Sequence, residues 1–125
     1  MREALSGAAP IAPEILELFY AAGVPVMEGY GMTETMAVGT VNRQDPFRFG
    51  TVGRALPGVE VRIAADGEVR MRGPHVFTCY WENEAATREV LDEDGWLHTG
   101  DLRSLDENGF LSITGRKKDI IITAG

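Results

Sequence analysis

The stretch VEVRIAADGEVRMR at residues 59–72 determines how the second half of the chain is expected to fold. Apolar residues alternate with charged ones on both sides of Asp66-Gly67, a dipeptide that favours a tight hairpin turn. Alternation with a period of two is typical of β-strands. The stretch therefore predicts a β-hairpin whose apolar positions are Val59, Val61, Ile63, Val69 and Met71.

Further turn signals follow this hairpin. Asp94-Gly95 and Asn108-Gly109 flank two short segments with strand-forming residues, 96–99 and 110–114. A short helix is expected over residues 84–91, with Asn83 as its N-cap. Short strands joined by regular turns predict a small antiparallel β-barrel-like subdomain over residues 51–115.

The first fifty residues carry a different pattern. Apolar residues recur at helical spacing from Ile11 to Ala22, which predicts a helix that ends at Gly23. A short buried strand is expected at residues 24–27, and a glycine-punctuated loop at residues 28–35. This pattern is typical of α/β architecture. The predicted fold class is therefore α+β, with the end of an α/β subdomain in residues 1–50 followed by the barrel-like subdomain.

Composition narrows the possible functions. The 125 residues include 12 basic and 19 acidic ones, and the formal net charge of −7 argues against broad nucleic-acid binding. No apolar run approaches the roughly 20 residues that span a bilayer, and the N-terminus lacks the apolar core of a signal peptide. A cytoplasmic location is the default expectation. The single cysteine, Cys79, excludes an internal disulfide framework and a cysteine-cluster zinc site.

Three loops hold the residues with binding chemistry. In the first, Tyr30 offers a flat face to a base, Thr33 a hydroxyl to a phosphate oxygen, and Glu34 a carboxylate to Mg²⁺. In the second, Asp101 can accept two hydrogen bonds from a ribose diol. In the third, Arg116 can donate to hydroxyls or phosphate. Taken singly, each loop is explained at least as well by a turn with structural or solvated side chains.

In this order and at this spacing, the loops resemble the adenylate-forming superfamily of acyl-CoA synthetases, adenylation domains and luciferases. The matching segments are residues 29–35 (a Tyr-Gly-x-Thr-Glu motif), 67–73, 80–81 and 83–87 (a second block), 95–101 (Thr-Gly-Asp) and 115–119 (Gly-Arg-x-Lys-Asp). The run 115–125, with residues 6–10 upstream, most resembles bacterial long-chain fatty-acid–CoA ligases.

The resemblance implies a two-step reaction that uses ATP, Mg²⁺, a fatty acid and CoA. A carboxylate attacks the α-phosphate of ATP to give acyl-AMP and pyrophosphate, and the CoA thiol then displaces AMP. The residues to which the resemblance gives roles are Gly7, Ala8 and Ala9 beside the adenine, Tyr30 on its other side with Gly29 and Gly31 close to the nucleotide, Thr33 at the α-phosphate, Glu34 at Mg²⁺, Asp101 and Arg116 at the ribose, and Lys118 at a domain hinge.

Two departures from the family pattern stand out. Cys79 occupies a position where the family commonly has glycine, so the chain there needs either an ordinary backbone conformation or strain. The family's upstream phosphate loop, most of its fatty-acid tunnel and the catalytic lysine of its downstream domain are not among the 125 residues. We therefore interpret the chain as an internal fragment, with residues 116–125 as a hinge and the first strand of a further domain. The missing parts of the full-length enzyme are its expected partners.

Two alternatives remain open at this stage. The same adenylation chemistry could act on an aryl or amino acid instead of a fatty acid. A non-catalytic β-rich binding module would have no nucleotide affinity, and a thermal shift with AMP or ATP separates it from an adenylate site. Peripheral membrane association of a full-length enzyme is also left open.

Overall fold

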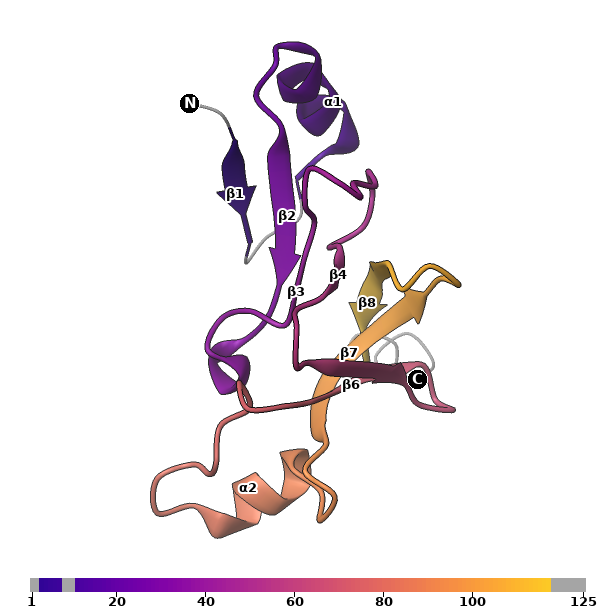
Figure 1. Cartoon of the computed structure of the whole chain (residues 1–125). Helices are drawn as coiled ribbons and strands as arrows, with labels where there is room; N and C mark the ends of the chain where they lie inside the picture. The colour runs from indigo at the N-terminus through magenta and orange to yellow at the C-terminus, as the bar shows by residue number, and fades with distance from the viewer. Residues whose placement is uncertain (1–2, 8–10, 118–125) are drawn as a thin grey trace.

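In the described residues, 3–7 and 11–117 of the computed structural model, two four-stranded sheets form the framework (Figure 1). The first has the order β1-β2-β3-β4 and the second the order β5-β6-β7-β8. The strands are β1 (Ala4–Ser6), β2 (Val26–Tyr30), β3 (Thr40–Val41), β4 (Arg54–Ala55), β5 (Glu60–Ile63), β6 (Glu68–Arg72), β7 (Leu97–Leu105) and β8 (Leu111–Arg116). The helices are α1 (Pro13–Ala21), α2 (Glu84–Val90) and the short 3₁₀ helix η1 (Thr33–Thr35). Figure 1 shows α1 and α2 at opposite ends of the molecule.

The helix α1 and the strands beside it form the predicted α/β element. β1 and β2 are parallel, and α1 connects them. Pro13 stands in the first turn, where its fixed φ and missing N–H are tolerated. The helix ends at the C-cap Ala22, after which Gly23 adopts a φ of +79° that favours glycine. The sequence therefore predicted this helix and its end correctly.

The apolar residues of α1 are less buried than their helical spacing indicates. Leu16 is buried, but Leu18 is 69% exposed and Ile15 48% exposed. Tyr20, at the end of the helix, packs on Phe47 and Phe49 with ring centroids 5.6 and 5.3 Å apart. The physical reason is the small amount of neighbouring structure: among the described helices and strands, α1 packs mainly against the single strand β2.

The expectation of a loop over residues 28–35 is wrong for its first three residues. β2 continues through Tyr30, because Gly29 pairs with Val41 and Tyr30 with Thr40 of the antiparallel strand β3. A Cβ atom on Gly29 would lie 3.2 Å from the Thr40 carbonyl oxygen, so glycine permits close strand packing here. The remaining segment forms η1 and the turn after it.

The hairpin predicted from residues 59–72 is present as β5 and β6, with Val61 opposite Met71 and Ile63 opposite Val69. Val69 and Met71 are fully buried. They form one core cluster with Val52 and Leu111 and with Tyr30, which belongs to the first sheet. The two sheets therefore share a core, and this core holds Tyr30 against the second sheet.

The strand β7 contains an irregularity that shapes the site described below. Opposite β6, Glu68 pairs with Leu102 whereas Arg70 pairs with His98, so β7 has two more residues than β6 over this stretch. The extra length falls at Thr99, Gly100 and Asp101, and Gly100 has a φ of +72°. Such bulges commonly redirect a side chain at the edge of a binding site.

The Asn83 side chain caps α2 as predicted, accepting a hydrogen bond of 3.1 Å from the Ala86 N–H. Within residues 3–7 and 11–117, no helix has the length and apolar character required to cross a membrane. The predicted hinge residue Lys118 and the strand expected after it lie outside the described residues, as do Ala8 and Ala9.

Candidate functional site

A cavity of about 710 Å³ lies where the two sheets meet. This is within the usual range for small-molecule sites. Six of the residues predicted from the sequence line it: Gly7, Gly29, Tyr30, Gly31, Asp101 and Arg116. They come from four separate parts of the chain, and the fold brings them around one space.

A hydrogen bond between Tyr30 and Asp101 joins the two sheets at this cavity. The Tyr30 hydroxyl donates to Asp101 Oδ2 at 2.6 Å, across 71 positions of sequence. Burial, followed by the neighbouring Asp101 carboxylate, raises the pKa of Tyr30 above its ordinary value. The phenol therefore stays protonated at neutral pH and serves as a donor to an ionised carboxylate.

Arg103, which sequence reasoning did not single out, completes this pair. Its guanidinium lies 4.7 Å from the centroid of the Tyr30 ring, and its Nη2 lies 3.4 Å from Asp101 Oδ2. Arg103 is buried, and Tyr30 is only 8% exposed. The flat face of Tyr30 that the sequence offered to a base is thus largely covered by Arg103 and the core.

Arg116 approaches the same carboxylate from the end of β8. Its Nε lies 3.8 Å from Asp101 Oδ1, and its side chain is 78% exposed. Asp101 itself pairs with Arg116 in the β7–β8 ladder. The long exposed guanidinium is therefore free to donate to a ligand in the cavity, while its backbone is fixed beside Asp101.

Thr33 and Glu34 do not line the cavity, although Met32, directly before them, does. Glu34 Oε1 accepts a hydrogen bond of 2.5 Å from the Tyr80 hydroxyl. Its backbone carbonyl accepts a second, of 2.8 Å, from the Phe77 N–H. The segment before α2 thus fixes the position of η1 and of the Glu34 carboxylate.

The Glu34 carboxylate fits a Mg²⁺ ion bound together with phosphates. Over the part of the chain that is described, no group of three His, Cys, Asp or Glu side chains could hold a metal by itself. Mg²⁺ in phosphate-transfer sites commonly takes one or two carboxylates and completes its shell with phosphate oxygens and water. A single carboxylate with one oxygen held by Tyr80 meets that requirement.

The Tyr80 contact gives a measurable prediction. Its hydrogen bond to Glu34 raises the pKa of Tyr80 to about 12, because ionising the phenol would place two negative charges together. In the metal-free chain, Glu34→Gln should return this pKa toward the ordinary value of about 10. The measurement is an NMR titration of ¹³Cζ-labelled tyrosine in the wild type and in the variant. An unchanged Tyr80 pKa in the variant would show that the contact is not formed.

Cys79 adopts an ordinary backbone conformation. It is exposed, and it is not among the described non-glycine residues with positive φ, which are Met36, Ala37 and Glu82. Cysteine in place of the family's usual glycine therefore introduces no strain of this kind.

The chain belongs to the AMP-binding enzyme family, whose model matches residues 1–81. It is 48% identical over 124 residues to the long-chain-fatty-acid–CoA ligase FadD15 of Mycobacterium tuberculosis, a match that covers 99% of this chain and 20% of the relative. These findings confirm the resemblance to adenylate-forming enzymes.

Two solved structures show the same fold. Apo MatB from Rhodopseudomonas palustris matches with a TM-score of 0.88 and 39% identity, over 95% of this chain and 26% of that one. O-succinylbenzoate coenzyme A synthetase (MenE) from Bacillus subtilis, in complex with ATP and magnesium ion, matches with a TM-score of 0.85 and 33% identity, over 94% and 27%. They confirm the predicted fold class. The chain spans about a fifth of the length of the curated relatives that it matches.

Proposed function

We propose that this chain forms the adenosine-binding part of an AMP-forming long-chain fatty-acid–CoA ligase. The observation that carries the proposal is the Tyr30–Asp101 hydrogen bond at the wall of the cavity between the sheets. A carboxylate held in this way can accept hydrogen bonds from both hydroxyls of a ribose. The 48% identity to a long-chain-fatty-acid–CoA ligase supports a fatty acid over an aryl or amino acid as the substrate.

The proposed reaction proceeds by two displacements. The fatty-acid carboxylate attacks the α-phosphorus of ATP, and pyrophosphate leaves as acyl-AMP forms. The thiol of CoA then attacks the acyl carbonyl, loses its proton, and AMP leaves as the thioester forms. The protein's part in such chemistry is to position the reactants and to place compensating charge.

We assign the following roles to the main site residues. Asp101 and Arg116 hold the ribose, Tyr30 keeps Asp101 oriented, and residues 7–9 border the adenine. The Thr33 hydroxyl donates to an α-phosphate oxygen and the Glu34 carboxylate holds Mg²⁺, beyond Met32 at the cavity's edge. When bound, Mg²⁺ neutralises charge on the phosphates. Lys118 is the proposed hinge.

The subdomain boundaries are part of the same proposal: residues 1–50, 51–115 and 116–125. Residues 52–55 connect the first two parts. The Val52 N–H donates to the Leu111 carbonyl of β8 at 2.8 Å, whereas β4, just after it, pairs with β3. Because residues 52–55 bond to both sheets, they hold the two walls of the cavity in place.

Nucleotide binding without turnover is the expected behaviour of the 125-residue chain. Circular dichroism should first establish that the chain is folded. AMP should then raise its melting temperature, whereas ATP, Mg²⁺ and palmitate together should release no more pyrophosphate than the Glu34→Ala variant does. The reason is that the phosphate loop and catalytic lysine implied by the resemblance are not among these residues. A folded chain whose melting temperature AMP leaves unchanged would contradict the proposal.

A further inference from the structure

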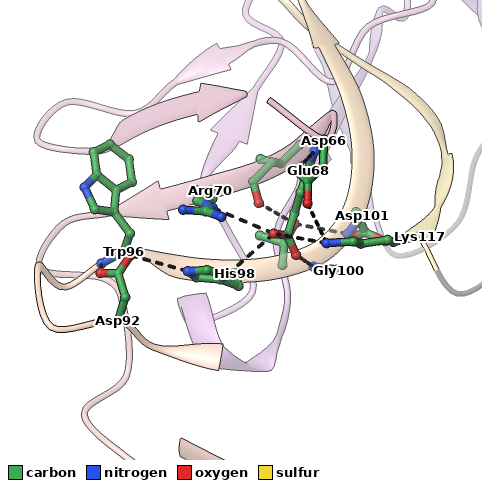
Figure 2. Close-up of polar contacts among 11 residues, drawn as sticks. Asp66, Glu68, Arg70, Asp92, Trp96, His98, Gly100, Asp101 and Lys117 are labelled. Atoms are coloured by element: carbon green, nitrogen blue, oxygen red, sulfur yellow. Dashed lines mark hydrogen bonds and ion pairs between the residues drawn. The ribbon is translucent and has the colours of Figure 1, made fainter. Parts of the chain in front are cut away.

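Glu68 is a buried carboxylate at the start of β6, close to the proposed ribose site but not part of the cavity wall. It is only 4% exposed, although the alternation of β6 favours solvent on its side of the strand. Three basic side chains surround its Oε2, at 3.5 Å from His98 Nδ1, 3.7 Å from Arg70 Nε and 3.9 Å from Lys117 Nζ. Figure 2 shows these side chains converging on Glu68.

Glu68 makes a still shorter contact, through its other oxygen, with the backbone of the bulge. Glu68 Oε1 accepts a hydrogen bond of 3.0 Å from the Gly100 N–H. The bulge moves Gly100 out of the β6–β7 pairing, so this N–H needs a partner from a side chain. A buried N–H without a partner is costly, and an ionised carboxylate is the stronger kind of acceptor.

Thr99 fixes the other side of the bulge. Its Oγ1 donates to the Val69 carbonyl at 2.8 Å and accepts from the Asp101 N–H at 3.2 Å. Two side chains therefore replace the missing backbone pairing, and both hold the residues next to the Asp101 side chain. Through them, the carboxylate of Asp101 is directed at the Tyr30 hydroxyl.

We infer that Glu68 is a positioning residue for the ribose-binding carboxylate of Asp101, acting through the N–H of Gly100. The inference rests on the proposed function, because it gives Asp101 the ribose diol as its ligand. Glu68 also lies near Lys117, the residue after Arg116, whose Nζ is 2.6 Å from Asp66 Oδ2. The cluster thus ties both ribose-binding segments, β7 and the end of β8, to the β5–β6 turn.

The test compares two ligands that differ only in the ribose diol, AMP and 2′,3′-dideoxy-AMP, by isothermal titration calorimetry on the 125-residue chain. Glu68→Ala should weaken AMP binding about tenfold and leave the dideoxy ligand unchanged. Glu68→Gln should keep AMP affinity within about threefold, because its amide oxygen still reaches Gly100. Glu60→Gln, which removes an exposed carboxylate paired with Arg72 on β5, is the matched control and should change neither affinity.

The shorter carboxylate of Glu68→Asp keeps the charge but cannot reach the Gly100 N–H, so it should behave as Glu68→Ala does. It also serves if the alanine variant does not fold. Equal weakening of both ligands in the alanine and aspartate variants would overturn the inference, because a general loss of structure does not distinguish the diol. So would full AMP affinity in both variants.

A second readout separates this inference from the proposed function. If the folded wild-type chain binds no AMP, the proposed function fails, and amide hydrogen exchange at Gly100 decides the role of Glu68. Exchange at Gly100 should be slow in the wild type and in Glu68→Gln and at least tenfold faster in Glu68→Asp. Equal exchange rates in all three would overturn the positioning role.

Discussion

Asp101→Ala is expected to weaken AMP binding by at least about 100-fold. The carboxylate is the proposed acceptor for both ribose hydroxyls, and hydrogen bonds to charged groups contribute about 1.5–3 kcal/mol each. The substitution also leaves the buried Tyr30 hydroxyl without its 2.6 Å acceptor and Arg103 without its counter-charge. The substitution therefore removes the carboxylate that binds the ribose and also the contacts that hold Tyr30 and Arg103 in place at the cavity.

Calorimetric titration of the 125-residue chain with AMP measures this effect. Asp94→Ala is the matched control, because Asp94 is an exposed aspartate in a turn outside the cavity lining. It should bind AMP as the wild type does, and circular dichroism should show both variants folded. An Asp101→Ala chain that binds AMP within threefold of the wild type would remove Asp101 from the ribose site.

Gly31→Ala is expected to cost about 3 kcal/mol of the free energy of unfolding. A Cβ atom at this position would lie 2.4 Å from the backbone of Ala37 and Val38, on the turn that follows η1. Backbone atoms cannot move aside as a flexible side chain does, so the turn that carries Thr33 and Glu34 would have to shift. AMP binding should weaken with stability, since Gly31 lines the cavity.

Alanine substitutions at two other glycines, where the added Cβ atom meets less steric conflict, serve as controls for replacing glycine by alanine. At Gly29 the added Cβ would meet the Thr40 carbonyl oxygen at 3.2 Å, and at Gly7 the Gly29 carbonyl oxygen at an ordinary 3.6 Å. Chemical denaturation should therefore rank the three alanine variants with Gly31 most destabilised, Gly29 intermediate and Gly7 close to the wild type. The steric account fails if Gly31→Ala is as stable as Gly7→Ala.

Hairpins and helix ends were predictable from the sequence because residues close together in the chain specify them. Alternation around Asp66-Gly67 predicted the β5–β6 hairpin, and Asn83 predicted the start of α2. Both depend on residues a few positions apart. Most of the motif residues that line the cavity were also predictable, since they belong to short glycine-containing sequence motifs of recognisable spacing.

Features that depend on distant pairing were not predictable. Gly29 and Tyr30 lie in β2, not in a loop, because β3 pairs with them. Glu68 is buried because a bulge in β7, some thirty residues later, requires its carboxylate. Arg103 reaches Tyr30 only once the two sheets meet. For Glu68 and Arg103, the one available signal in the sequence was a charged residue within a segment that otherwise forms a strand.

An AMP titration of the ¹⁵N-labelled 125-residue chain, followed by amide chemical shifts, tests whether this chain forms an adenosine site. We expect saturable shifts at Gly29, Tyr30, Gly31, Gly100 and Asp101, which come together only in the folded cavity. Amides of α2, at the far end of the molecule from α1 (Figure 1), should not move. A folded chain with no saturable shifts, or with shifts confined to residues away from the cavity, would contradict the claim that this chain forms an adenosine site.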